Sequence, residues 1–159
     1  MTIQFRVTGK PEGQPRVKAR AVKNKNTGKS FATVYTPKTN AGFKDDVMIQ
    51  ARRHKPVAPL TGPLRVDIEA IFRRPKKHFW TGKRAHLLRD DAPTMHTRTP
   101  DRDNVDKLIL DALTNVGFWL DDCQVCAGEV RKRYADPGEE TGAIITICEE
   151  FERRERQPA

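Results

Sequence analysis

The densest grouping of aspartates in the sequence lies in two short stretches, and these are the residues best suited to catalysis. Asp101, Asp103 and Asp106 stand at the start of a segment with helical periodicity, and Asp121 and Asp122 follow a glycine turn. Asp101 and Asp103 are two positions apart where a loop meets the helix, so both carboxylates can converge on one point. Mg²⁺ commonly takes one or two carboxylates, retained waters and a substrate phosphate as ligands. This grouping is therefore a candidate site for a hard divalent cation.

A purely structural role for two of these acids is the alternative. Asp103 is in a position to cap the helix, and Asp101 can complement the helix dipole from the preceding turn. The charge of the chain weighs against this alternative, because 30 Lys and Arg against 21 Asp and Glu give a formal net charge of +9. An acidic pocket in a protein that binds polyanions would repel the ligand unless a metal ion neutralised the pocket. This conflict favours a metal site.

The positive charge is concentrated in two segments. Residues 1–38 contain nine Lys and Arg and one Glu, and residues 73–98 contain eight Lys and Arg and two Asp. The rest of the chain is net acidic. Segregation of this kind indicates a surface that contacts phosphates, so nucleic acid is the expected partner. An ordinary basic surface that only keeps the protein soluble is the alternative.

Two helices are expected from the spacing of apolar residues. One begins near Asp103, which is a good candidate for its N-cap. Its apolar stripe consists of Val105, Leu108, Ile109, Ala112 and Leu113. The other is an amphipathic helix over residues 40–54.

Strands are predicted in four places. Apolar and polar residues alternate over residues 3–7 and 64–72, which is the pattern of half-buried strands. Residues 125–134 and 143–147 predict two more strands. The turn Asp136-Pro137-Gly138 lies between these two, so we expect them to form a hairpin.

The remaining segments lack a regular period. Residues 12–30 read as a loop or a loosely twisted hairpin, residues 73–100 as a long functional loop, and residues 151–159 as a charged tail. Together the elements predict an α/β fold: a single mixed α+β domain over residues 1–150, with a sheet packed against two main helices. We expect the acids to gather at one edge of that sheet.

Three runs of residues resemble the signature of the RusA-type Holliday junction resolvases, which are crossover junction endodeoxyribonucleases. The runs are Thr99-Pro100-Asp101-Arg102-Asp103-Asn104-Val105-Asp106-Lys107, Asp111-Ala112-Leu113 and Asp121-Asp122-Cys123-Gln124-Val125. Weaker similarity extends upstream through Gln14-Pro15-Arg16 and Tyr35-Thr36-Pro37-Lys38, so that the resemblance covers most of residues 3–149. The long basic loop 73–100 departs from the most compact members of that family.

The resemblance implies a RusA-like endonuclease domain and assigns roles to individual residues. Asp101, Asp103 and Asp122 match the metal-binding acids of the family, and Lys107 matches its essential lysine. Asp121 is the second candidate ligand beside Asp122. The implied cofactor is Mg²⁺, with Mn²⁺ as an alternative. Two divalent ions held by carboxylates can activate a water and neutralise the negative charge that develops on a phosphodiester during hydrolysis.

The function implied is a metal-dependent, structure-selective endodeoxyribonuclease that resolves four-way DNA junctions by symmetric phosphodiester hydrolysis. Lys107 lies one helical turn after Asp103, so its ammonium group can reach the same phosphate; the alternative is an ion pair with Asp103 or Asp111. A homodimer is expected, because a two-fold protein places one site at each of two equivalent strands. The rival hypotheses are a non-catalytic DNA-binding module and a less selective metal-dependent nuclease.

Contacts to the DNA backbone are expected from the two basic segments. In the second segment Phe79 and Trp80 alternate with cations, which suits phosphate contact combined with stacking on an unpaired base. Attachment of these two rings to the core is the alternative. The predicted DNA-binding residues are Arg16, Lys18, Arg20, Lys38, Arg73, Arg74, Lys76, Lys77, Trp80, Lys83 and Arg84.

Several other functions are not supported. The chain has no apolar run long enough to span a bilayer and no apolar signal core, so we expect no membrane partner and a cytoplasmic location in a bacterial or phage-infected cell. The run 27–30 imitates the end of a phosphate-binding loop, but Lys23 stands where that loop needs glycine, so no nucleotide cofactor is expected. Cys123 and Cys126 form a lone C-x-x-C pair, which we interpret as reduced thiols.

Overall fold

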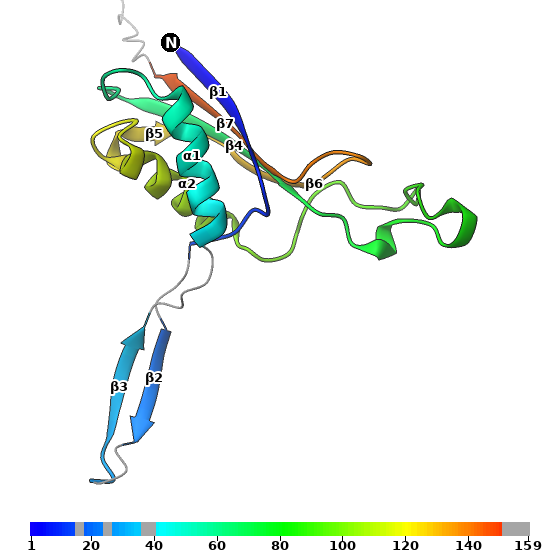
Figure 1. The fold of residues 1–159 in the computed structure, drawn as a ribbon, viewed down its shortest axis with the longest axis horizontal. Coiled ribbons are helices and arrows are strands. Elements are labelled where there is room, and N and C mark those ends of the chain that lie inside the picture. The colour runs from blue at the N-terminus through cyan, green and yellow to red at the C-terminus, as the bar shows by residue number, and fades with distance from the viewer. Residues whose placement is uncertain (15–17, 24–26, 36–40, 151–159) are drawn as a thin grey trace, which may run out of the picture.

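The computed structural model describes residues 1–14, 18–23, 27–35 and 41–150. Its centre is a mixed β-sheet covered on one face by two helices (Figure 1). This arrangement confirms the expected mixed α+β fold with a sheet packed against two main helices. The predicted charged tail, residues 151–159, lies outside the described residues.

Three long strands form the body of the sheet. β4 (Leu64–Phe72) is flanked by β7 (Gly142–Glu149), which pairs in turn with β1 (Thr2–Thr8), and both pairings are antiparallel. Along β4 the side chains of Leu64, Val66 and Ile68 are buried, whereas the residues between them are only half-buried. The alternation seen in the sequence therefore divides the strand between a core face and a polar face.

Both main helices cover the apolar face of the sheet. α1 (Ala41–His54) buries Phe43, Val47 and Ala51, and α2 (Arg102–Val116) buries the stripe predicted from the sequence. The two helices pack against each other and, with the strands, enclose one hydrophobic core. The predicted helices and the strands at both ends of the chain are therefore confirmed.

The predicted hairpin of residues 125–134 and 143–147 is wrong. The first segment is divided into β5 (Val125–Ala127) and β6 (Val130–Tyr134), and both pair in parallel with β4. β4 lies between β6 and β7, so the turn at residues 136–138 joins strands that are not neighbours. The division falls at Gly128, where an added Cβ atom would lie 2.0 Å from the carbonyl oxygen of Val66. Only glycine permits this close approach of the edge strand to β4.

Two segments project from this core in Figure 1. One is an antiparallel pair of β2 (Lys18–Lys23) and β3 (Ser30–Tyr35), so a hairpin is present, but its second strand lies almost wholly beyond the predicted segment 12–30. The other is the predicted long loop, residues 73–100, which we call the arm. The arm contains two short 3-10 turns, η1 (Lys76–His78) and η2 (Gly82–Arg84), and an isolated antiparallel bridge between Phe79 and Leu88. Among the described residues, no helix has the length and apolar character needed to cross a membrane.

Candidate active site

The first turn of α2 carries two of the predicted catalytic acids at the protein surface. The carbonyl oxygen of Asp101 accepts a backbone hydrogen bond from Val105, and Asp101 has extended backbone angles, so Asp101 occupies the N-cap position. The prediction that Asp103 caps the helix is therefore wrong, because Asp103 already lies inside the first turn. Both aspartates are exposed. Their negative charge is favourable at the positive end of the helix dipole.

The segment after β1 contacts the first half of α2. The backbone N–H of Gln14 donates to the carbonyl of Asn104 over 2.8 Å, and its side-chain amide donates to a carboxylate oxygen of Asp111 over 2.8 Å. Next to it, Gly13 passes so close that an added Cβ atom would lie 2.9 Å from the Cβ atoms of Asn104 and Pro100. These contacts fix the first half of the helix.

Lys132, on β6, holds the residues immediately before Asp101. Its ammonium group donates to the carbonyl oxygens of Arg98 and Pro100 over 2.7 and 2.6 Å. Burial lowers the pKa of Lys132 below its ordinary value, and the charge of Asp101 opposes this shift. The side chain also lies over the Phe72 ring, with 6.0 Å from its nitrogen to the ring centroid. The sheet therefore positions the loop from which Asp101 emerges.

A cationic cavity of about 560 Å³ opens beside Asp101. Three cationic side chains and one carboxylate line it, together with two threonine residues, so its net charge is positive. The lining residues are Thr97, Arg98, Thr99, Asp101, Arg102 and Lys132. A cavity with this balance of charge and hydrogen-bond donors suits a phosphate group of a nucleic acid.

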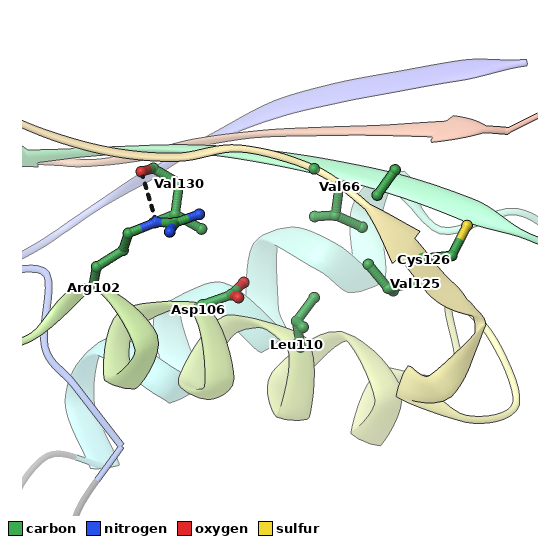
Figure 2. A pocket seen from close by; sticks show the side chains of 9 residues that line it. Val66, Arg102, Asp106, Leu110, Val125, Cys126 and Val130 are labelled. Atoms are coloured by element: carbon green, nitrogen blue, oxygen red, sulfur yellow. Dashed lines mark hydrogen bonds between the residues drawn. The ribbon is translucent and has the colours of Figure 1, made fainter.

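Asp106 faces a second cavity between α2 and the edge of the sheet. Figure 2 shows Asp106 and Leu110 pointing from the helix toward β5 and β6, in a cavity of about 260 Å³. Burial raises the pKa of Asp106. Arg102 lies at the end of this cavity, and its Nε atom donates to the carbonyl of Val130 over 3.2 Å. Asp106 therefore lies on the sheet side of α2 instead of sharing the exposed surface of Asp101 and Asp103.

The other predicted acids follow the far end of α2. The helix ends at its C-cap, Gly117, whose φ of 80° is left-handed and therefore favours glycine. The chain then reaches η3 (Asp122–Gln124). The carboxylate of Asp121 accepts a hydrogen bond from the backbone N–H of Cys123 over 2.9 Å, and this bond lowers the pKa of Asp121. The side chain of Gln124 completes a capping box. Asp121 thus has a local structural role, whereas Asp122 is an exposed residue of the turn.

The two pairs of acids do not meet within one chain. α2 has 15 residues, which corresponds to about 22 Å of helix between them. Among the residues that the structure describes, no three His, Cys, Asp or Glu side chains are grouped closely enough to hold a metal ion. Within one protomer these acids therefore do not form a single metal-holding group. Asp101 and Asp103 alone still match the carboxylate requirement of a Mg²⁺ site that also uses substrate phosphate.

The predicted DNA-binding residues of the arm differ in their surroundings. Arg74 is used structurally, since its guanidinium donates to the carbonyls of Ala135 and Pro93, both over 2.7 Å, and lies over the Tyr134 ring. The other predicted residues of the arm are exposed: Arg73, Lys76, Lys77, Trp80, Lys83 and Arg84. On the hairpin, Arg20 is exposed and Lys18 lies at the start of β2, while Arg16 and Lys38 lie outside the described residues. Lys107 is exposed on α2, one turn after Asp103.

Sequence reasoning missed Arg98, Arg102 and Lys132 as residues of the cavity beside Asp101. A signal for Lys132 was present, because with a period of two it shares one face of β6 with Val130 and Tyr134. A lysine on that face is costly to bury without partners. The same pattern therefore indicated that Lys132 binds backbone carbonyls or charged groups beneath the helix layer.

The fold and this surface define a DNA-processing domain, with paired aspartates and a cationic cavity at the start of one helix. Comparison with known proteins is consistent with this class. The model of the family "Endodeoxyribonuclease RusA" matches residues 9–147, and the chain therefore belongs to the RusA endodeoxyribonuclease family. It is also similar to the "Uncharacterized protein YqaN" of Bacillus subtilis (strain 168), with 30% identity over 134 residues, which are 84% of this chain and 89% of that protein.

Membership of the family confirms the resemblance found in the sequence. RusA proteins are endodeoxyribonucleases that act on branched DNA, so nuclease activity and a DNA partner follow for this chain at the level of the family. The similar Bacillus protein carries no named activity. Substrate selectivity, metal dependence and the roles of individual residues remain predictions.

Proposed function

We propose that this protein is a metal-dependent endonuclease that resolves four-way DNA junctions by paired, symmetric nicks. The observation that carries the proposal is the position of Asp101 in the wall of a cationic cavity of about 560 Å³, one residue before a helix start that also presents Asp103. The cations attract a DNA phosphate, and the two carboxylates supply the oxygen ligands of a divalent cation.

Asp101 and Asp103 are the residues we assign to hold Mg²⁺, or Mn²⁺ in its place, together with the bound phosphate. The metal supplies an activated water and neutralises charge on the phosphate. Lys132 keeps the loop of Asp101 in place through its two carbonyl contacts. Lys107, exposed one turn along α2, supplies a positive charge to the same phosphate.

A second copy of the chain is our proposed source of the remaining acid. Asp122 lies beyond the opposite end of α2, so one protomer does not bring it to Asp101 and Asp103. In a two-fold homodimer each contact between the protomers occurs twice. Contact between the start of one α2 and the end of the other would therefore complete two equivalent sites. Two sites related in this way suit two symmetric nicks.

The decisive experiment compares the wild-type protein with Asp103→Asn on a labelled four-way junction and on a linear duplex, with Mg²⁺, Mn²⁺ or chelator. We expect metal-dependent paired nicks in the junction for the wild type, and loss of nicking with retained binding for Asp103→Asn. Asp45→Asn, which neutralises an exposed acid on α1, is the matched control and should nick normally. Junction binding without any metal-dependent nicking would refute the catalytic proposal in favour of a DNA-binding module, and equal cleavage of the duplex would favour a less selective nuclease.

Sharing of the site between protomers is tested by mixing two inactive variants, Asp103→Asn and Asp122→Asn. In a mixed dimer, one protomer retains Asp103 and the other retains Asp122, so a shared arrangement restores one complete site and single nicks reappear. If each site belonged to one protomer, every site in the mixture would stay defective. An inactive mixture whose mixed dimers have been verified by affinity pull-down would therefore refute the shared site.

A further inference from the structure

The arm contains a short antiparallel ladder near its tip. The backbone N–H of Trp80 donates to the carbonyl of Leu87, and that of Arg89 donates to the carbonyl of His78, each over 3.0 Å. Between these bonds, Phe79 and Leu88 form an isolated bridge. Cross-strand partners of an antiparallel pair present their side chains on the same face. Trp80 and Leu87 therefore share one face of the arm, and Phe79 and Leu88 share the other.

The face of Trp80 and Leu87 is apolar and open to solvent. Trp80 is 40% exposed and Leu87 is 47% exposed, so neither side chain is buried against the core. The guanidinium carbon of Arg89 lies 5.5 Å from the centroid of the Trp80 ring, and Asp91 holds Arg89 through two hydrogen bonds of 2.9 and 3.1 Å. The indole is thus oriented by a cation that is itself fixed.

The base of the arm is attached firmly to the sheet. His78 is only 6% exposed and meets the Tyr134 ring edge-on at 4.8 Å between centroids, while His96 stacks on Phe72 at 3.9 Å. Burial lowers the pKa of both histidines, so their neutral forms are favoured against these rings. The guanidinium of Arg74 joins the two ends of the arm to the core. The arm that carries the apolar face is therefore anchored to the sheet at its base.

The surroundings of this face are cationic. η1 and η2, which lie on either side of Trp80 in the sequence, contribute four exposed cations: Lys76, Lys77, Lys83 and Arg84. An exposed apolar surface among cations is unsuited to a purely apolar ligand. It suits a ligand that combines flat aromatic groups with negative charges, and nucleic acid has both.

We propose that Trp80 and Leu87 form a stacking surface for an unpaired DNA base at the branch point, with the cations of η1 and η2 bound to the adjacent phosphates. The proposal rests on the DNA-directed function proposed above and adds that the arm binds an unpaired base of the substrate. Fully paired duplex does not offer a free base face, whereas a junction with open pairs at its centre does. The arm would therefore contribute selectivity for branched or single-stranded DNA, apart from the acids that cut it.

The test uses the full-length protein, a labelled oligothymidine strand and a duplex of equal length, in chelator and at one fixed salt concentration. We expect Trp80→Ala to weaken binding to the single strand by about fivefold or more, because stacking of one base on an aromatic ring contributes about 1–3 kcal/mol. Its binding to duplex should change less than twofold. Trp80→Phe keeps a ring and should restore binding, while Ile49→Ala, which shortens another exposed apolar side chain, should change neither.

Tryptophan fluorescence gives a second readout. The chain has two tryptophans, and Trp119 is only 1% exposed, so stacking of a base should quench mainly Trp80. The quench should be present in the wild type and absent in Trp80→Phe, although that variant still binds. Equal loss of duplex and single-strand affinity in Trp80→Ala, or an unchanged quench in Trp80→Phe, would overturn the proposal. These measurements involve no cleavage, so a protein that does not nick junctions can still pass or fail them.

Discussion

Lys132→Met tests how the sheet positions the candidate active site. The substitution keeps an unbranched side chain over Phe72 but removes the ammonium group that donates to the carbonyls of Arg98 and Pro100. The loop before Asp101 then lacks its attachment to β6. We expect the loop to shift and the site to lose activity, while the basic arm still binds DNA.

The expected magnitude follows from these two contacts. Hydrogen bonds from a charged donor contribute about 1.5–3 kcal/mol each, and the cost of burying the ammonium, which also lowers the pKa of Lys132, offsets part of that sum. A net loss of about 2 kcal/mol in the free energy of unfolding is expected, which a domain of this size tolerates. Displacement of a catalytic group by about 1 Å lowers the rate by roughly 100-fold.

The assay combines urea denaturation with single-turnover nicking of a junction at saturating protein. Arg131→Met is the matched control, because it removes one positive charge from the neighbouring, exposed position, which faces the opposite side of the sheet. Lys132→Arg should restore part of the rate, since its guanidinium can donate to the same carbonyls. Wild-type stability and wild-type nicking in Lys132→Met would refute the positioning role.

Two further predictions concern stability. Gly128→Ala should lower the free energy of unfolding in urea by about 3 kcal/mol, because its Cβ atom would collide with the carbonyl of Val66; Gly138→Ala, also at positive φ but with no atom within 4 Å of the added Cβ, should cost only about 1 kcal/mol. Glu139 accepts hydrogen bonds from Arg133, which lower its pKa from 4.5 to about 2. Its stabilisation is therefore present above pH 4.5 and lost as the pH falls toward 2, with a ceiling of about 3 kcal/mol. Glu139→Gln should flatten this part of the pH–stability profile, and an unchanged acid profile would contradict the assignment.

Local patterns predicted the individual elements well. The alternation over the first six residues of β4 and the apolar stripe of α2 follow from burial on one face, and both were found where the sequence placed them; the last three residues of β4 are all buried. The order of strands did not follow in the same way. The turn at residues 136–138 favours a hairpin locally, yet β4 pairs with both β6 and β7 and lies between them. A contact between segments so far apart in sequence leaves no signal in the turn itself.

In the candidate site, too, local patterns predicted some residues, whereas contacts between distant segments could not be predicted. The paired aspartates at the start of α2 could be predicted, because they adjoin a strong helical pattern. Their distance from Asp122 could also have been derived, since the predicted helix already implied about 20 Å between its ends. The cavity beside Asp101 could not, because Arg98, Arg102 and Lys132 come from a loop, a helix and a strand that only the folded chain brings together.

The pairing of β1 with β7 joins the two ends of the folded domain. The amino group of Met1 donates to a carboxylate oxygen of Glu149 over 2.9 Å, and the register runs from Thr2 opposite Cys148 to Thr8 opposite Gly142. During synthesis, β1 and β4 must therefore wait for the last strand before either gains its antiparallel partner, so folding of this domain is completed only after residue 149 has left the ribosome. For the same reason the ends can be connected by a short linker and the chain reopened at Gly82 in the arm, giving a circular permutant in which every strand of the sheet is intact.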